Sequence, residues 1–206
     1  MSLTAPPVAE RTETFLDLTN YPELAQLAEN FEQYQQELAN SNEWFDWQAD
    51  ATDPSGHCAF LTGKWDVSPV YFGLWGPEDL TAMDTEEEQQ YIGKLVAGLP
   101  TAFPKLYAAI SAIPYVNYAA FSRLAPRSKL DTHTHENPRN VTFHLGLKMP
   151  AGGTCGTHCG DDQHIWEQAG EAILFDDNLP HGAWNDSDQE RVVLHMSIRR
   201  DKATSN

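Results

Sequence analysis

The sequence predicts a mainly β protein with N-terminal helices, in which the β part forms a small barrel or jelly roll. Segments with the apolar spacing of helices are found before residue 114. From there to about residue 200, short β-branched and aromatic runs are separated by turn residues, which is typical of such folds. The 206 residues, 41% of them hydrophobic, suffice for one domain. We therefore expect a single domain over 1–206, with a helical or mixed support region at 13–113 and a jelly-roll core at 114–200.

The first expected helix follows a polar, Pro-containing start of about 12 residues that we predict to be loose. Asn20 is suited to cap this helix, and Pro22 is suited to its first turn. Apolar residues then recur at spacings of 3, 4, 3 and 4, which places them on one face of a helix. These residues are Leu24, Leu27, Phe31, Tyr34 and Leu38.

The region after this helix is mixed. Residues 67–76, VSPVYFGLWG, contain short strand signals. Thr85 and Glu88 match a capping box, which predicts a second helix ending at about Val96, where Gly and Pro follow. Thr101 is suited to cap a third helix.

Four strands stand out after Pro114. Each is a run of β-branched, aromatic and aliphatic residues bounded by turn residues. They cover YVNYAAFSRL at 115–124, NVTFHLGLKM at 140–149, EAILFDD at 171–177 and RVVLHMSIRR at 191–200. The last six residues, DKATSN, are expected to be disordered.

Composition excludes several classes of partner. The formal net charge of -17 argues against nucleic acid, because phosphate binding needs a basic surface. No segment approaches the roughly 20 apolar residues that span a bilayer, and the N-terminus does not resemble a secretory signal. Three cysteines are an odd set that fits a reducing compartment. We expect a soluble cytoplasmic protein without a membrane or nucleic-acid partner; the sequence does not indicate an oligomeric state.

Histidines cluster in residues 131–146, DTHTHENPRNVTFHLG, which contain three of the chain's eight. Histidine is the commonest metal ligand and the usual proton carrier near neutral pH. His133 and His135 are two residues apart, so on an extended segment their side chains point the same way. With the distant His181, they form a pattern typical of a mononuclear iron site that leaves positions open. Arg191 follows ten residues later and is suited to grip a carboxylate with two hydrogen bonds, such as the far carboxylate of 2-oxoglutarate.

Together these motifs carry a family resemblance. The segment from Ser122 to Arg199 resembles the aspartyl/asparaginyl β-hydroxylase family of Fe(II)- and 2-oxoglutarate-dependent oxygenases. The motifs are HTHENP at 133–138, HLGL at 144–147, FDDNLPHGAWN at 175–185 and RVVLHMSI at 191–198. The resemblance implies a double-stranded β-helix, the cupin-like jelly roll, which agrees with the strand pattern.

The resemblance also implies roles for individual residues. His133 and His181 match the two iron-binding histidines. Arg191 matches the arginine that binds the distal carboxylate of 2-oxoglutarate, and Ser122 matches the serine that assists it. His144 matches a histidine near the carboxylate that chelates iron.

Two positions depart from the family pattern. His135 occupies a position that is often Asp, or Gly in the animal enzymes. It is compatible with a third nitrogen ligand, with a donor outside the ligand set, or with a substrate contact. Thr142 occupies a position where animal members have an Arg that helps hold 2-oxoglutarate. The near carboxylate would then depend on His144 alone or on another group such as Arg139.

The resulting expectation is a dioxygenase that uses Fe(II), 2-oxoglutarate and O2, with the jelly-roll core as its catalytic part. It would oxidise 2-oxoglutarate to succinate and carbon dioxide while hydroxylating an unactivated carbon. We favour an amino acid or an Asp/Asn-type peptidyl residue as the substrate, so the expected partner is a small molecule or a peptide.

Two alternatives remain open. A cupin-like metal- or ligand-binding module without oxygen chemistry would account for the histidines but not for Arg191. A structural zinc site could use Cys155 and Cys159 with His158 and His164, although the spacing lacks a second ligand pair.

Overall fold

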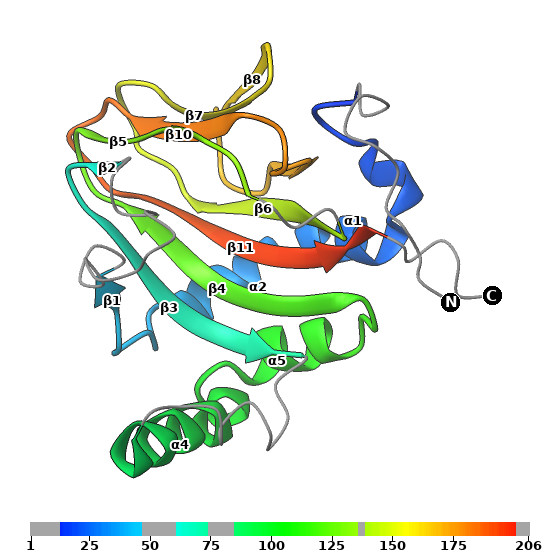
Figure 1. The fold of residues 1–206 in the computed structure, drawn as a ribbon, viewed down its shortest axis with the longest axis vertical. Helices are drawn as coiled ribbons and strands as arrows, with labels where there is room; N and C mark the ends of the chain where they lie inside the picture. Colours follow the sequence, from blue (N-terminus) through cyan, green and yellow to red (C-terminus); the bar gives the residue numbers. More distant parts are fainter. Residues whose placement is uncertain (1–12, 47–60, 74–84, 136–138, 201–206) are drawn as a thin grey trace.

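The computed structural model describes residues 13–46, 61–73, 85–135 and 139–200. Its strands form two antiparallel sheets (Figure 1). The six-stranded sheet has the order β1-β3-β4-β11-β6-β9, and the five-stranded sheet has the order β2-β5-β10-β7-β8. The strands are β1 Phe45–Asp46, β2 Leu61–Thr62, β3 Trp65–Phe72, β4 Val116–Leu124, β5 Ser128–His133, β6 Asn140–Lys148, β7 Cys155–Cys159, β8 Asp162–Ile165, β9 Ala172–Phe175, β10 His181–Asn185 and β11 Arg191–Arg199.

Eight strands, from β4 to β11, build the jelly roll. Along the chain, β4, β6, β9 and β11 join the larger sheet, while β5, β7, β8 and β10 join the smaller one. This crossing between two facing sheets is the double-stranded β-helix, so the predicted fold class is confirmed. The three strands before residue 114 extend these sheets, because β1 and β3 continue the larger sheet beside β4 and β2 pairs with β5.

Helices lie against the larger sheet on the side away from the smaller one (Figure 1). They are α1 Pro22–Glu29, α2 Phe31–Leu38, α4 Glu86–Ala102 and α5 Pro104–Ser111, with a 3-10 turn at Leu18–Asn20. None of the helices in the described ranges is long and apolar enough to span a membrane.

The single helix predicted after Asn20 is in fact two. The break comes at Asn30, whose side-chain Nδ2 donates to the carbonyl of Gln26 at 2.9 Å and so competes for a helical acceptor. The predicted cap was also wrong, because Asn20 ends the 3-10 turn and Tyr21 precedes α1 without a side-chain capping bond.

The second predicted helix begins as expected directly after Thr85 but does not end near Val96. It continues through Pro100 to Ala102, because Leu99 is 2% exposed and packs in the core. Thr101 therefore lies inside α4 rather than capping α5, which begins at Pro104. The loose ends predicted at residues 1–12 and 201–206 lie outside the described residues.

The main core lies outside the jelly roll, between the larger sheet and the helices. Alternate residues of β6 and β11 pack there with side chains of α1, α2 and α5. The strand residues are Val141, Phe143, Leu145, Leu147, Val192, Leu194, Met196 and Ile198. The residues between them face the interior of the jelly roll, which is thereby left for polar side chains such as His144 and Arg191.

Candidate metal and anion site

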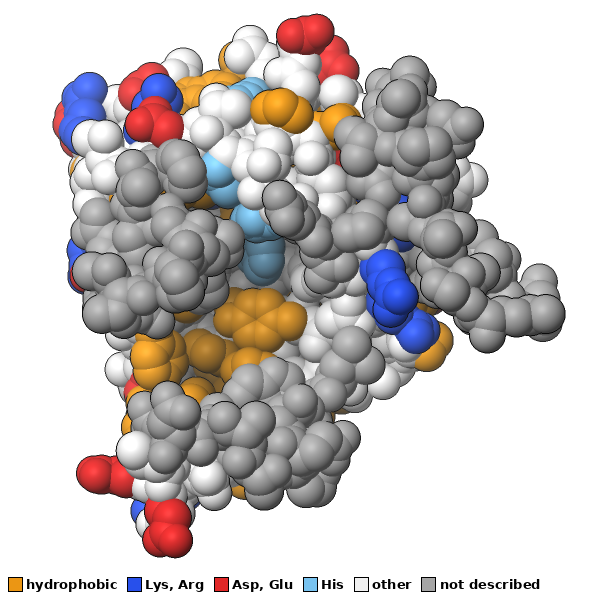
Figure 2. All heavy atoms as spheres, viewed as in Figure 1, with side chains coloured by type: hydrophobic (Ala, Val, Ile, Leu, Met, Phe, Trp, Pro, Cys, Tyr) orange, Lys and Arg blue, Asp and Glu red, His pale blue; other side chains and the backbone are white. Residues whose placement is uncertain are grey.

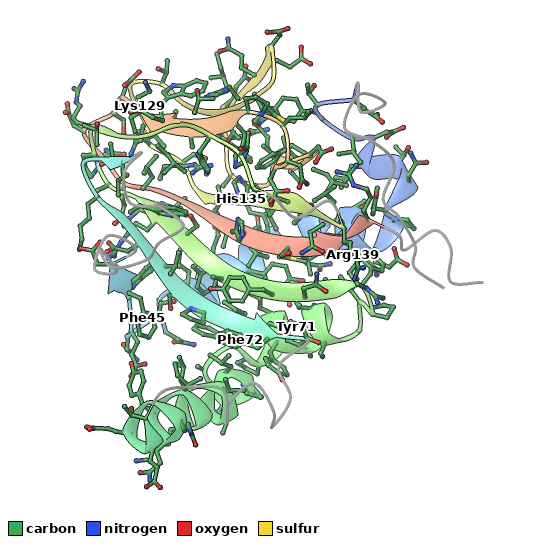
Figure 3. All side chains as sticks on the ribbon, viewed as in Figure 1. Phe45, Tyr71, Phe72, Lys129, His135 and Arg139 are labelled. Carbon is green, nitrogen blue, oxygen red and sulfur yellow. The ribbon has the colours of Figure 1, made fainter. Side chains whose placement is uncertain are left out.

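Three histidines converge between the two sheets. His133, the last residue of β5, lies directly opposite His181, the first residue of β10. His135 follows two residues after His133, and Figure 3 shows it between the sheets. The ring centroids are 4.2 Å apart for His133 and His181, 5.0 Å for His135 and His181, and 5.2 Å for His133 and His135. Their candidate ligand atoms all lie within 4.8 Å of one another, and no other described set of His, Cys, Asp and Glu groups in this way.

Hydrogen bonds select the ring nitrogen that each histidine presents. The Nδ1–H groups of His133 and His181 donate to the carbonyl oxygens of Asp131 and Leu179, both at 2.9 Å. The Nδ1–H of His135 donates to Oδ2 of Asp177 at 3.1 Å. Because Nδ1 carries the proton in each ring, Nε2 is the unprotonated nitrogen and is the atom suited to bind a metal ion.

Charge states in this cluster suit a cation. Burial, reinforced by repulsion from His133, lowers the pKa of His181 to about 4, so its ring is neutral near pH 7. Burial alone would raise the pKa of Asp177, but hydrogen bonds from His135 and Thr142 produce a net lowering of that pKa. The cluster therefore combines a neutral ligand ring with a carboxylate that stays ionised.

Arg191 supplies a buried positive charge at the other end of the same cavity. Its side chain is 2% exposed, and Nη2 donates to the hydroxyl of Thr157 at 3.3 Å. Its Nε has no hydrogen-bond partner, and within the described residues no acidic side chain forms an ion pair with it. Burial lowers the pKa of Arg191 to about 10, which still leaves it cationic at neutral pH. A buried charge without a counter-ion is costly, so this geometry suits an anionic ligand.

His144 and His195 form a second pair of histidines. They lie directly opposite each other on β6 and β11, with Nε2 of His144 3.0 Å from Nδ1 of His195. Burial lowers the pKa of both rings, to about 4 for His195 and well below the usual range for His144. The neutral pair shares one proton across this contact, and the buried Nδ1 of His144 has no hydrogen-bond partner among the described residues.

All six predicted site residues line one cavity: Ser122, His133, His135, His144, His181 and Arg191. Ser122 accepts a hydrogen bond from the indole of Trp65 at 2.8 Å. A second cavity shares His133 and His135 and extends to Val67 and Tyr118. Figure 2 shows histidine side chains grouped above a hydrophobic surface. The structure thus brings the predicted residues together, while the role of each stays a prediction.

The zinc ligands considered from the sequence do not converge in the described structure. Cys155 and Cys159 are buried in the apolar cluster inside the jelly roll, and burial raises the pKa of both thiols, that of Cys159 to about 12. His158 contacts Thr132, and His164 contacts Glu171. Protonated thiols are poor metal ligands, so this alternative has no support here.

Sequence reasoning missed several residues of the site. Asp177 belongs to a quoted motif but received no role, and His195 lies four residues after Arg191 on the same face of β11. Alternate residues of a strand point to the same face, so the even spacing from Arg191 to His195 was the one signal in the sequence that His195 belongs to the site. Arg139, considered as a replacement for an arginine at Thr142, is exposed before β6 and does not line either cavity (Figure 3).

The fold and the site define a jelly-roll protein with a histidine cluster suited to a metal ion and a buried arginine suited to an anion. The family model described as aspartyl/asparaginyl beta-hydroxylase matches residues 22–201, and the chain belongs to this family. It is 37% identical to the ornithine lipid ester-linked acyl 2-hydroxylase of Rhizobium tropici over 97 residues, and this aligned segment covers 47% of this chain and 34% of that protein. It is 28% identical over 78 residues to the mouse aspartyl/asparaginyl beta-hydroxylase, covering 38% of this chain and 10% of that protein.

The chain therefore spans about a third of the Rhizobium relative and a tenth of the mouse relative. Among solved structures, it is similar to an oxidoreductase of the 2OG-Fe(II) oxygenase family from Burkholderia pseudomallei, with a TM-score of 0.46 and 14% identity over 81% of this chain and 78% of that one. It is also similar to a predicted oxalate decarboxylase from Thermotoga maritima, with a TM-score of 0.39 and 14% identity over 68% of this chain and 84% of that one.

Proposed function

We propose that this protein is an Fe(II)- and 2-oxoglutarate-dependent dioxygenase that hydroxylates an unactivated carbon. The observation that carries the proposal is the content of one cavity. Three histidine rings converge at one end, and a buried arginine without an acidic partner lies at the other. The histidines would bind the metal ion, and the arginine would pair with the far carboxylate of a keto acid that chelates this ion.

The donor set fits the two groups. His133 and His181 would hold Fe(II), with His135 or water at a third position, because imidazole nitrogens suit Fe(II) and the site needs open positions for other ligands. Arg191, assisted by Ser122, pairs with the distal carboxylate of 2-oxoglutarate. When bound, the iron supplies the oxidation chemistry with O2, in which 2-oxoglutarate is converted to succinate and carbon dioxide.

The protein's own contribution is orientation and exclusion of water. The buried Nδ1 of His144, which has no partner in the structure, is available to the near carboxylate of 2-oxoglutarate. His195 fixes the orientation of that ring by its bond to Nε2. Trp65, which donates to Ser122, closes the side of the cavity toward β3.

For the substrate, we propose an amino acid or an Asp/Asn-type peptidyl residue that presents an uncharged group to the iron. The second cavity is lined by Trp65, Val67, Tyr118 and Leu130 beside the histidines, without a Lys or Arg among its described residues. A substrate carboxylate in this cavity would have no cationic partner among the described lining residues, which favours an Asn-type or aliphatic group over an Asp-type group.

The proposal is tested by an anaerobic titration with Fe(II) and then 2-oxoglutarate, monitored through the weak visible charge-transfer band of the chelate. We expect the band in the wild type and in His164→Ala, whose ring lies outside the cluster. We expect its loss in His133→Ala. Iron bound by the wild type without a band after 2-oxoglutarate is added would instead favour a cupin-like binding module.

A further inference from the structure

We propose that Asp177 and Thr142 are positioning residues that fix His135 as the third nitrogen ligand of the metal ion. The inference rests on the proposed function, since it concerns the same metal site. It decides between the three roles that the sequence leaves open for His135, and it gives Thr142 a role of its own.

His135 is tied twice to a residue far away in the sequence. Its backbone N–H donates to the carbonyl of Asp177 at 3.0 Å, and its ring Nδ1–H donates to Oδ2 of the same residue at 3.1 Å. The other two histidines lie within paired strands, and each ring donates to a carbonyl two residues earlier in its own chain segment. His135 lies beyond the end of β5, so its bonds to Asp177 replace the strand pairing that orients the other two rings.

Asp177 is itself held in place from the interior face of β6. The side chain of Asp177 is 10% exposed, and its Oδ2 accepts a second hydrogen bond, from the hydroxyl of the buried Thr142 at 2.9 Å. Its Oδ1 accepts a longer bond from Nδ2 of Asn178 at 3.3 Å. Among the described residues, the one ion-pair partner of Asp177 is His135. No Lys or Arg therefore competes for the carboxylate oxygen that orients the ring.

This arrangement favours the ligand role of His135 over the other two. A carboxylate only accepts at Nδ1, so the ring keeps its proton there and presents the lone pair of Nε2. The centroid of the ring lies 5.0 Å from that of His181, and the candidate ligand atom of His135 lies within 4.8 Å of those of His133 and His181. A neutral imidazole has only one N–H, and in His135 this N–H donates to Asp177. The neutral ring therefore has no second N–H to donate to a substrate.

The test uses Co(II) as a spectroscopic probe in place of Fe(II), with wild type, His135→Ala, Asp177→Asn and Thr142→Val. Partners of a metal-bound histidine contribute about 10- to 100-fold to metal affinity. We expect that loss in Asp177→Asn, a loss at least as large in His135→Ala, and a smaller loss of the same sign in Thr142→Val. The matched control is Asp188→Asn, an exposed aspartate that pairs with Arg127 outside the site and is expected to bind Co(II) like the wild type.

Proton NMR of the Co(II) protein distinguishes a ligand from a merely structural residue. Each metal-bound imidazole contributes one shifted, exchangeable ring N–H signal, so we expect three signals in the wild type and two in His135→Ala. Asp177→Asn is expected to shift or broaden one of the three. Two signals in the wild type, or unchanged Co(II) affinity in His135→Ala, would overturn the inference while leaving a two-histidine oxygenase intact. Failure of the wild type to bind metal would overturn the proposed function as well. If Asp177→Asn does not fold, the same measurements are made on His135→Ala, whose side chain is partly exposed in the wild type, and on Thr142→Val.

Discussion

Replacing Arg191 by Met is expected to stabilise the ligand-free protein and to weaken 2-oxoglutarate binding. The guanidinium is buried with one hydrogen bond, to Thr157, and an unpartnered Nε. Methionine fills similar space without a charge. Replacing buried charged groups by apolar ones is often neutral or stabilising by about 1–4 kcal/mol. If Arg191 only supported the fold, its replacement would not be expected to raise the stability of the protein while lowering its affinity for 2-oxoglutarate.

The size of the binding effect follows from the charge-assisted pair that is lost. Such a pair contributes roughly 1.5–3 kcal/mol, which corresponds to an affinity about tenfold to a hundredfold weaker. At 2-oxoglutarate concentrations of about 100 times the wild-type Kd, the ligand stabilises the wild type by about 2.7 kcal/mol. A variant with a hundredfold weaker Kd gains only about 0.4 kcal/mol under the same conditions. For a chain of this length, the rise in Tm is then about 5–11 °C in the wild type and about 1–2 °C in the variant.

The assay is thermal unfolding of the metal-loaded protein under anaerobic conditions, with and without 2-oxoglutarate. Arg127→Met is the matched control, because Arg127 is an exposed arginine paired with Asp188. The control is expected to keep the wild-type rise in Tm. The reasoning is refuted if Arg191→Met shows the full ligand-induced rise, or if it is destabilised without ligand and still binds normally.

Three further predictions concern residues of the jelly roll. His195→Phe removes the partner of Nε2 of His144, worth about 0.5–1.5 kcal/mol, so the Kd for 2-oxoglutarate should rise severalfold in the same titration. The pKa values of about 4 for His181 and His195 lie below that of an unfolded histidine, so the unfolded chain binds more protons between about pH 6.5 and 4. The free energy of unfolding of the metal-free protein should therefore fall as the pH is lowered from about 6.5 to 4, by about 1.4 kcal/mol per pH unit and histidine. A flat profile in urea unfolding would contradict the burial of these rings. Gly156→Ala places a methyl group 2.2 Å from a tryptophan ring of β10 and should cost about 1–3 kcal/mol, while Gly152→Ala, in open space, should leave Tm unchanged.

The larger sheet could be predicted from the sequence because its strands carry a strong apolar pattern. Strands β4, β6, β9 and β11 fall within the four segments singled out after Pro114. The smaller sheet could not be predicted in the same way, since β7 reads CGTHC, β8 reads DQHI and β10 reads HGAWN. These short strands have little β propensity, and what holds them is pairing with one another and packing of Cys155 and Cys159 in the inner cluster.

The candidate site was predictable where one strand or motif carries the residues. His133, His144 and Arg191 were found from motifs, spacing and the family resemblance, and all three line the cavity between the sheets. The contribution of Asp177 could not be found, because its bond to His135 joins positions 42 residues apart and depends on how β9 and β5 end next to each other. Such a contact is a property of the tertiary fold rather than of either segment.

The position of the hydrophobic core explains how this protein can keep so many polar groups inside. In many jelly rolls, apolar side chains fill the space between the two sheets, but here most apolar side chains of the larger sheet pack against α1, α2 and α5, and a smaller apolar cluster lies inside the jelly roll. Its inner face is therefore free to carry His144, Arg191 and other groups whose burial is unfavourable without partners. Two of their nitrogens, Nδ1 of His144 and Nε of Arg191, have no hydrogen-bond partner within the described part of the chain. A ligand that forms hydrogen bonds with these atoms removes the cost of burying them unpaired, and this adds to its binding free energy. The arrangement that limits the stability of the interior therefore strengthens binding there.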